Sequence, residues 1–176
     1  LGPGVVVASV AAGRTLDDLS AAADRPVARL MPNLAVRHGA GLVAVATRDV
    51  ERERRDELTS FLGVLGTVTV IDESLFDVAT ALAGSGPGIV ALVAEALEAG
   101  GVEEGLTLPD ARAMVQAVLA GTAALLADGL DPAELRARVS SPGGTTVAAV
   151  EALEEGAVRR HLALAVRAAA TRSGEL

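Results

Sequence analysis

The first 72 residues alternate between short apolar runs and amphipathic stretches. Runs rich in apolar and β-branched residues predict four strands: GPGVVVASVAAG (2–13), VARLMP (27–32), GLVAVAT (41–47) and TVTVI (67–71). Thr15 predicts the start of a short helix after the first run, and Asp49 predicts that of a charged amphipathic helix before the fourth. Strands that alternate with helices predict an α/β fold with a parallel sheet. The four predicted strands alone would make an incomplete sheet of this kind.

After residue 72 the strand signals stop and helical periodicity follows. The predicted helices begin at Ser74, run across 84–101, begin at Thr107, begin at Asp131, and form a final pair from Thr145 to the C-terminus that Gly156 separates. At Thr107 and Asp131 a capping side chain precedes a proline and an acidic residue three positions on, which is typical of helix N-termini. We therefore expect an α/β part over 1–72 and an all-helical part over 73–176.

Hydrophobic residues make up 51% of the 176 residues, which is high for a chain with a net charge of −8. No uninterrupted apolar run reaches the roughly 18 residues that span a bilayer, because Glu95, Arg112 and Gln116 interrupt the two most apolar stretches. Helices that are apolar on more than one face then indicate a subunit interface. We expect an oligomer and no membrane partner.

The ionisable residues exclude several kinds of chemistry. The 23 acidic residues outnumber the 15 basic ones, all of them Arg, which argues against nucleic acid as a partner. Because Cys, Lys and Tyr are absent from the chain, it supplies no thiolate, Schiff-base lysine or tyrosine acid; a reducing, cytoplasmic location is expected. His38 and His161 lie far apart without metal-ligand spacing, so we expect no metal site.

The stretch SSPGGTTVAAVEALEEG (140–156) predicts a tight turn that leads directly into a helix. Proline and paired glycines favour the turn, and the threonines fall where a helix presents unpaired backbone N–H groups. Such an end attracts carboxylate or phosphate groups. Plain capping of the helix by a Ser or Thr side chain is the structural alternative, and the stretch alone leaves both open.

Three segments in order resemble the pyrroline-5-carboxylate reductase family: RLMPNLAVRHGAG (29–41), LAGSGPGIVALVAEALEAGGVEEGL (82–106) and residues 132–176, which contain VSSPGGTT and end in RSGEL. The resemblance implies part of a Rossmann-like domain over 1–72 and a helical dimerisation domain over 73–176. It also implies NADPH- or NADH-dependent reduction of 1-pyrroline-5-carboxylate to L-proline, by homodimers that can assemble as five dimers into a decamer.

The resemblance also assigns roles to residues. The substrate carboxylate would bind to the loop residues Ser141, Gly143, Gly144, Thr145 and Thr146. Thr146 would orient the imine and help to deliver the proton. The cofactor would contact Ala12, Gly13, Met31, Pro32, Asn33 and Ser85. Ordinary strand-to-loop turns and a tight packing turn are the alternatives for these last segments.

The chain departs from the family pattern at several positions. The glycine-rich G-x-G-x-M-G fingerprint does not occur in it, so we expect a piece that begins about halfway through the Rossmann domain and binds NADPH poorly alone. Leu34 and Ala35 replace the family's Thr-Pro, Ile89 an aromatic residue, and Ala137 an acid. Two alternatives stay open: reduction of another cyclic imine carboxylate, and a non-catalytic oligomerisation protein. The preference between NADPH and NADH cannot be inferred.

Overall fold

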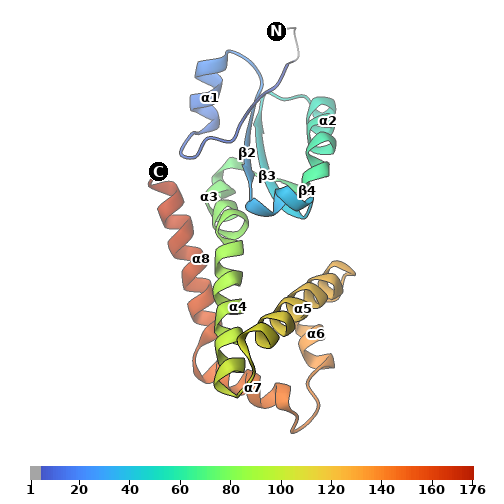
Figure 1. Cartoon of the computed structure of the whole chain (residues 1–176). Helices are drawn as coiled ribbons and strands as arrows, with labels where there is room; N and C mark the ends of the chain where they lie inside the picture. Colours follow the sequence, from blue (N-terminus) through green and yellow to red (C-terminus); the bar gives the residue numbers. More distant parts are fainter. Residues whose placement is uncertain (1–4) are drawn as a thin grey trace. The chain divides into compact units, whose positions relative to one another are not determined.

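The computed structural model describes residues 5–176, which form two compact units (Figure 1). The first contains the described residues up to Gly88 together with Ala163–Leu176, and the second contains Ile89–Leu162. Each unit is described by itself. The predicted domain boundary after residue 72 stays a prediction.

The first unit contains a four-stranded sheet in the order β1 (Val7–Ser9), β2 (Val27–Pro32), β3 (Gly41–Arg48) and β4 (Gly66–Val70). β1 and β2 are parallel, as are β3 and β4, but β2 and β3 are antiparallel. The prediction of a parallel sheet is therefore wrong, and the sheet is mixed. The reason is the short connection 33–40, because parallel neighbours need a crossover of about a dozen residues or more.

Both faces of the sheet are covered. Val43 and Val45 of β3 pack with Leu62 of α2 (Arg52–Leu62), whereas Ala46 lies in the cluster on the other face. That second cluster includes Leu16 of α1 (Leu16–Ala23) and Phe76 of α3 (Phe76–Ala79). The apolar run of β3 is thus buried on both faces.

The charged helix begins later than predicted. α2 starts at Arg52, with Glu51 at its N-cap, because Asp49 has a φ of +56° and so lies outside the helical region. Thr15 caps α1 as expected: its hydroxyl accepts from the Asp18 N–H at 3.1 Å, and its own N–H donates to the Asp18 carboxylate at 3.1 Å.

The remaining elements are helical: the short turns η1 (Leu34–His38), η2 (Gly63–Leu65) and η3 (Glu73–Leu75), the π-turn η4 (Thr80–Gly84), α4 (Gly86–Glu103), α5 (Leu108–Ala127), α6 (Pro132–Arg138), α7 (Thr145–Glu155) and α8 (Val158–Gly174). The predicted caps are confirmed, because Thr107 accepts from the Asp110 N–H and Asp131 accepts from two N–H groups of α6. Gly156 ends α7, but the positive φ between the last two helices, +53°, belongs to Ala157.

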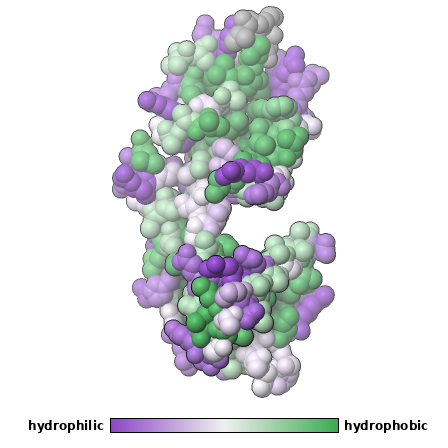
Figure 2. Space-filling model, in the orientation of Figure 1, coloured by the Kyte–Doolittle hydropathy of each residue, from purple (hydrophilic) through white to green (hydrophobic). Residues whose placement is uncertain are grey.

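Many large apolar side chains of the helices are exposed, including Leu92 at 65%, Met114 at 55% and Val118 at 60%. Figure 2 shows hydrophobic residues on the surface of both units. By length and composition alone, two helical stretches of the described chain could cross a membrane, Glu73–Glu103 and Leu108–Ala127. Glu98 and Arg112, one on each stretch, form an ion pair at 3.3 Å.

Candidate functional site

The loop 140–146 forms a tight turn before α7. The Gly144 N–H donates to the Ser141 carbonyl at 2.9 Å, with Pro142 and Gly143 between them. Gly143 has a φ of +67°, which favours glycine. Gly144 has an extended backbone, but a Cβ there would lie 2.9 Å from the Ser141 carbonyl oxygen and would overlap its hydroxyl. The two glycines are therefore required for different reasons.

The N-terminus of α7 carries unpaired hydrogen-bond donors. Its N-cap is Gly144, which offers no side chain, and the first N–H groups that return to the Gly144 carbonyl belong to Val147 and Ala148. Within residues 5–176, no hydrogen bond is formed by the N–H groups or hydroxyls of Thr145 and Thr146. Capping by a Ser or Thr side chain is therefore not what this helix uses, and its end can accept an anion.

In the first unit, the turn after β2 is held together by Asn33. Its side-chain oxygen accepts from the N–H groups of Ala35 at 3.1 Å and Leu42 at 3.3 Å, and its backbone N–H donates to the Leu42 carbonyl. Asn33 therefore fixes the turn to the start of β3. Within the described chain its amide N–H groups have no partner, so they can donate to a ligand.

Met31 and the turn at Ser85 are brought together by the fold. A Cβ on Gly84 would lie 2.6 Å from the Met31 methyl carbon, so a larger residue there would have to displace the end of the Met31 side chain. Ser85 is exposed and follows the π-turn of η4, where its N–H donates to the Thr80 carbonyl at 3.2 Å. Single π-turns inside helices often occur at functional sites.

Ala12 and Gly13 lie in the exposed loop that follows β1. The Ser9 hydroxyl accepts from the Ala11 N–H at 3.2 Å, and Gly13 has a φ of +68°. Because β1 and β2 are parallel, this loop and the turn that follows Pro32 lie at the same edge of the sheet. Ligands of open α/β sheets bind at that edge.

The predicted residues fall into two groups. Those expected to contact a cofactor, Ala12, Gly13, Met31, Pro32, Asn33 and Ser85, belong to the first unit, and those expected to bind a carboxylate, Ser141 and Gly143–Thr146, belong to the second. The roles of both groups stay predictions.

An ion-paired cluster on the first unit was not expected from the sequence. The Glu73 carboxylate accepts from the Leu16 N–H at 2.5 Å and lies 3.7 Å from both Arg29 and Arg48. The Arg29 guanidinium also stacks over the Phe76 ring, 4.0 Å from its centre. Glu73 thus joins α1, β2 and β3 to the start of the helical part. Charge signs alone could not predict these pairings.

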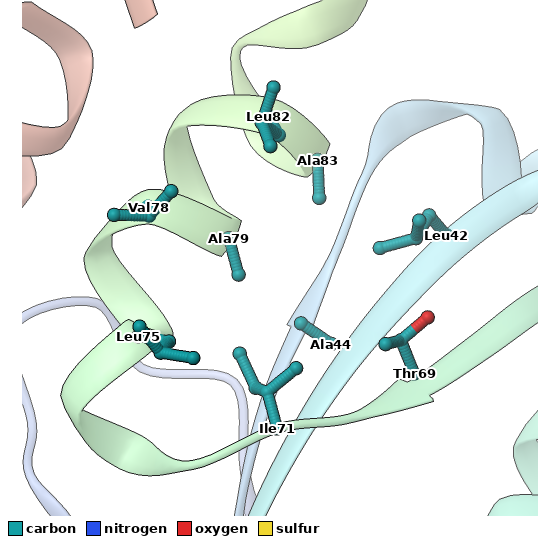
Figure 3. A pocket seen from close by; sticks show the side chains of 9 residues that line it. All are labelled: Leu42, Ala44, Thr69, Ile71, Leu75, Val78, Ala79, Leu82 and Ala83. Carbon is teal, nitrogen blue, oxygen red and sulfur yellow. The ribbon is translucent and has the colours of Figure 1, made fainter. Parts of the chain in front are cut away.

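An apolar pocket of about 320 Å³ lies between the sheet and the segment around α3. Figure 3 shows the side chains that line it. Leu42, Ala44, Thr69 and Ile71 line one side, and Leu75, Val78, Ala79, Leu82 and Ala83 line the other. The helical spacing of the three large residues 75, 78 and 82 is the sequence signal that could have found it. Thr69 is its only polar lining residue, so the pocket has no acid or base for chemistry.

No group of three or more His, Asp or Glu side chains among residues 5–176 could hold a metal ion. His38 is exposed, and the ring of exposed His161 lies 3.1 Å from the Ala157 carbonyl oxygen. Both are surface residues, as expected.

Residues 73–176 match the family described as pyrroline-5-carboxylate reductase dimerisation. The chain is 41% identical over 175 residues to a pyrroline-5-carboxylate reductase of Corynebacterium melassecola and 40% identical over 176 residues to one of Arabidopsis thaliana. These alignments cover 97% of the chain but 65% and 63% of the relatives. The chain therefore spans about two thirds of their length.

Two solved structures are also similar. A pyrroline-5-carboxylate reductase of Coxiella burnetii matches with a TM-score of 0.94 and 29% identity, over 98% of this chain and 66% of that one. The Plasmodium falciparum enzyme, solved with NADP bound, matches with a TM-score of 0.87 and 25% identity, over 97% and 69%. The similarity extends over both units of the chain.

Proposed function

The chain belongs to the pyrroline-5-carboxylate reductase family, and from this membership we propose that its protein reduces the C=N bond of 1-pyrroline-5-carboxylate to give L-proline. The observation that carries the proposal is the open N-terminus of α7. Unpaired N–H groups and free hydroxyls there suit the carboxylate of a small substrate. The relatives' names supply the identity of that substrate.

In this proposal the substrate carboxylate lies on the turn 141–146. Gly143 and Gly144 let the backbone approach it closely, and the N–H groups of Thr145 and Thr146, with the hydroxyls of Ser141 and Thr145, donate to its oxygens. The positive end of the helix dipole adds a favourable term for the anion. The turn thereby orients the ring for reaction.

Thr146 is the proposed catalytic residue. Its hydroxyl would donate to the imine nitrogen and help to deliver the proton that converts the imine to an iminium. When bound, the dinucleotide supplies the hydride that forms the new C–H bond. The product ring then contains a neutral secondary amine, whose nitrogen takes up a further proton from water. This chemistry needs no Lys, Tyr or Cys, in agreement with the composition.

The residues of the first unit fit the nicotinamide end of NADPH or NADH. Free amide donors on Asn33 and the exposed loop at Gly13 follow parallel strands on one sheet edge. We propose that the cofactor is held there by Ala12, Gly13, Met31, Pro32, Asn33 and Ser85. Residues 1–72 would be the second part of the nucleotide domain, and 73–176 the dimerisation and substrate-loop domain.

We also propose a homodimer, with five dimers in a ring as the larger assembly. Exposed side chains such as Leu92, Met114 and Val118 would be covered by the second subunit. A bilayer is a poorer cover for the same helices, because Glu98 and Arg112 would lie within the two stretches that cross it. The expected location is the cytoplasm.

The test is NADPH oxidation with 1-pyrroline-5-carboxylate, on protein whose intact mass has first been compared with that of the 176 residues. Thr146→Ala should lower kcat/KM by about tenfold or more, the effect of losing a positioned donor. Thr146→Ser should restore most of it, and exposed Thr67→Ala on β4 is the matched control. Unchanged kinetics in Thr146→Ala would reduce Thr146 to a structural residue.

The wild-type protein separates the alternatives. Turnover of another cyclic imine carboxylate, without turnover of 1-pyrroline-5-carboxylate, would replace the substrate but keep the reaction. A dimer that binds L-proline and oxidises no NADPH would indicate an oligomerisation protein.

A further inference from the structure

The chain ends in Arg-Ser-Gly-Glu-Leu, residues 172–176, here termed the C-terminal segment. α8 ends within it, at Gly174, and the Arg172–Glu175 ion pair at 3.1 Å and the Leu176 N–H to the Ser173 carbonyl at 3.3 Å close the last turn. The segment belongs to the same compact unit as the sheet, so its contacts with residues 5–88 are internal to that unit.

Ser173 joins the C-terminal segment to α3. Its hydroxyl donates to the Asp77 carboxylate at 2.8 Å in a partly buried place. Gly174 lies beside the same carboxylate, because a Cβ there would be 3.2 Å from the second Asp77 oxygen. Asp77 follows Phe76, which is only 2% exposed and packs in the core beneath α1. The core therefore fixes the acceptor of this hydrogen bond.

The end of the C-terminal segment lies against the loop 10–15. A Cβ on Gly13 would lie 2.7 Å from the Leu176 carbonyl oxygen, so an alanine there would displace one of the two backbones. The loop is exposed. Within the described chain, the only side-chain hydrogen bond that holds it before Thr15 is the one from the Ala11 N–H to the Ser9 hydroxyl. Loops with so little packing of their own are usually mobile.

We propose that the C-terminal segment holds the loop 10–15 in the conformation that receives the dinucleotide. Ser173 and Asp77 are then positioning residues for cofactor binding, which act through Leu176 and Gly13. This inference rests on the proposed function, in which Gly13 contacts the cofactor. Because the substrate turn at Thr146 is in the other unit, loss of the contact changes the affinity for the nucleotide and not that for the carboxylate.

The experiment compares Ser173→Ala, Asp77→Ala and the double variant with Asp77→Asn, which keeps the Oδ1 acceptor. Ser60→Ala is the matched control, since Ser60 is an exposed serine of α2 whose hydroxyl has no hydrogen-bond partner in the described chain. Hydrogen exchange of the amides in residues 10–15 reports on the contact itself. Fluorescence titration with NADPH and calorimetric titration with L-proline report on the two ligands, on the full protein.

Ser173→Ala and Asp77→Ala should each speed exchange in the loop and weaken NADPH binding by about tenfold, the effect of losing one hydrogen bond to a charged acceptor. The double variant should bind NADPH as tightly as either single variant, because each single substitution already removes the same interaction. Asp77→Asn, which keeps a neutral acceptor, should weaken NADPH binding less than Asp77→Ala, Ser60→Ala should behave like the wild type, and L-proline affinity should be unchanged in every variant.

Unchanged exchange in Ser173→Ala would overturn the inference, as would faster exchange with unchanged NADPH affinity, which would make the contact merely structural. An equal loss of L-proline affinity would overturn it too. Failure of the proposed function is distinguishable, because a wild-type protein that binds neither NADPH nor L-proline refutes that function before any variant is compared.

Discussion

Replacing each glycine of the substrate turn with alanine separates two physical requirements. Gly143 has a φ of +67°, but nothing lies within 4 Å of an added Cβ. Gly144 has a φ of −81°, which any residue adopts, but its Cβ would lie 2.9 Å from the Ser141 carbonyl oxygen. Gly143→Ala therefore strains the backbone without a collision, whereas Gly144→Ala collides with the Ser141 carbonyl oxygen, a backbone atom that no rotamer change can move.

The two substitutions should lower the free energy of unfolding by similar amounts. A left-handed conformation costs an alanine about 1–2 kcal/mol. Alanine also lowers the conformational entropy of the unfolded chain, which offsets about 0.4–1 kcal/mol of that cost. Gly143→Ala should thus lower the free energy of unfolding by about 1 kcal/mol. Gly144→Ala must open the turn and lose the hydrogen bond to Ser141 at 2.9 Å, which is worth a similar amount of about 1 kcal/mol.

Activity should distinguish the two. Opening the turn moves the donors of α7, and a misplacement of about 1 Å can cost about 100-fold in rate. We therefore expect Gly144→Ala to lower kcat/KM for 1-pyrroline-5-carboxylate by about 100-fold and Gly143→Ala to lower it less. Urea unfolding and steady-state kinetics on the same samples measure both effects. Gly63→Ala is the control, because Gly63 has a φ of −58° and open space around it.

A Gly144→Ala protein with wild-type kcat/KM would refute this reasoning. It would mean either that the turn tolerates a Cβ or that the substrate does not bind there. The structure of the variant would decide between the two, since an unchanged hydrogen bond between residues 144 and 141 would point to the first.

Two further predictions concern assembly and pH. Val118→Glu would bury a charge in the proposed dimer interface and should raise the dimer dissociation constant by about 100-fold or more, as measured by sedimentation, while Ser60→Glu on α2 should leave it unchanged. The Thr15 backbone N–H and hydroxyl hold the pKa of Asp18 below its ordinary value. This stabilisation of α1 is therefore present above the pKa of an unfolded aspartate and is lost as the pH falls through the lowered value. NMR titration of the carboxyl group measures this, and a pKa at or above the ordinary value would contradict it.

Several local features of the fold could be predicted from short stretches. The strands at 27–32 and 41–47 were predicted to within a residue, because short apolar runs bounded by turn residues favour buried strands. The caps at Thr107 and Asp131 were predicted correctly because capping depends on side chains within three positions. The start of α2 was missed, since nothing near Asp49 reveals its positive φ.

The direction of β3 and the hydrogen bonding of the site could be learned only from the tertiary structure. Strand pairing depends on how the connection 33–40 folds back, and the apolar pattern of a strand buried on both faces is the same in either direction. The sequence identified the turn before α7 as an anion site or a capped helix, but only the structure established that Gly144 occupies the N-cap and leaves the donors unpaired.

The sequence by itself therefore determined most of the strands and helices, several caps, the apolar excess and the motifs that place the chain in its family, because these depend on neighbouring residues or on composition. Its first predicted strand was too long, since β1 covers Val7–Ser9 and residues 10–13 lie in an exposed loop. The tertiary structure decided which distant residues meet: Ser173 with Asp77, Leu176 with Gly13, and Glu73 with two arginines. These contacts leave no local signal, because each depends on the packing of elements that are far apart along the chain.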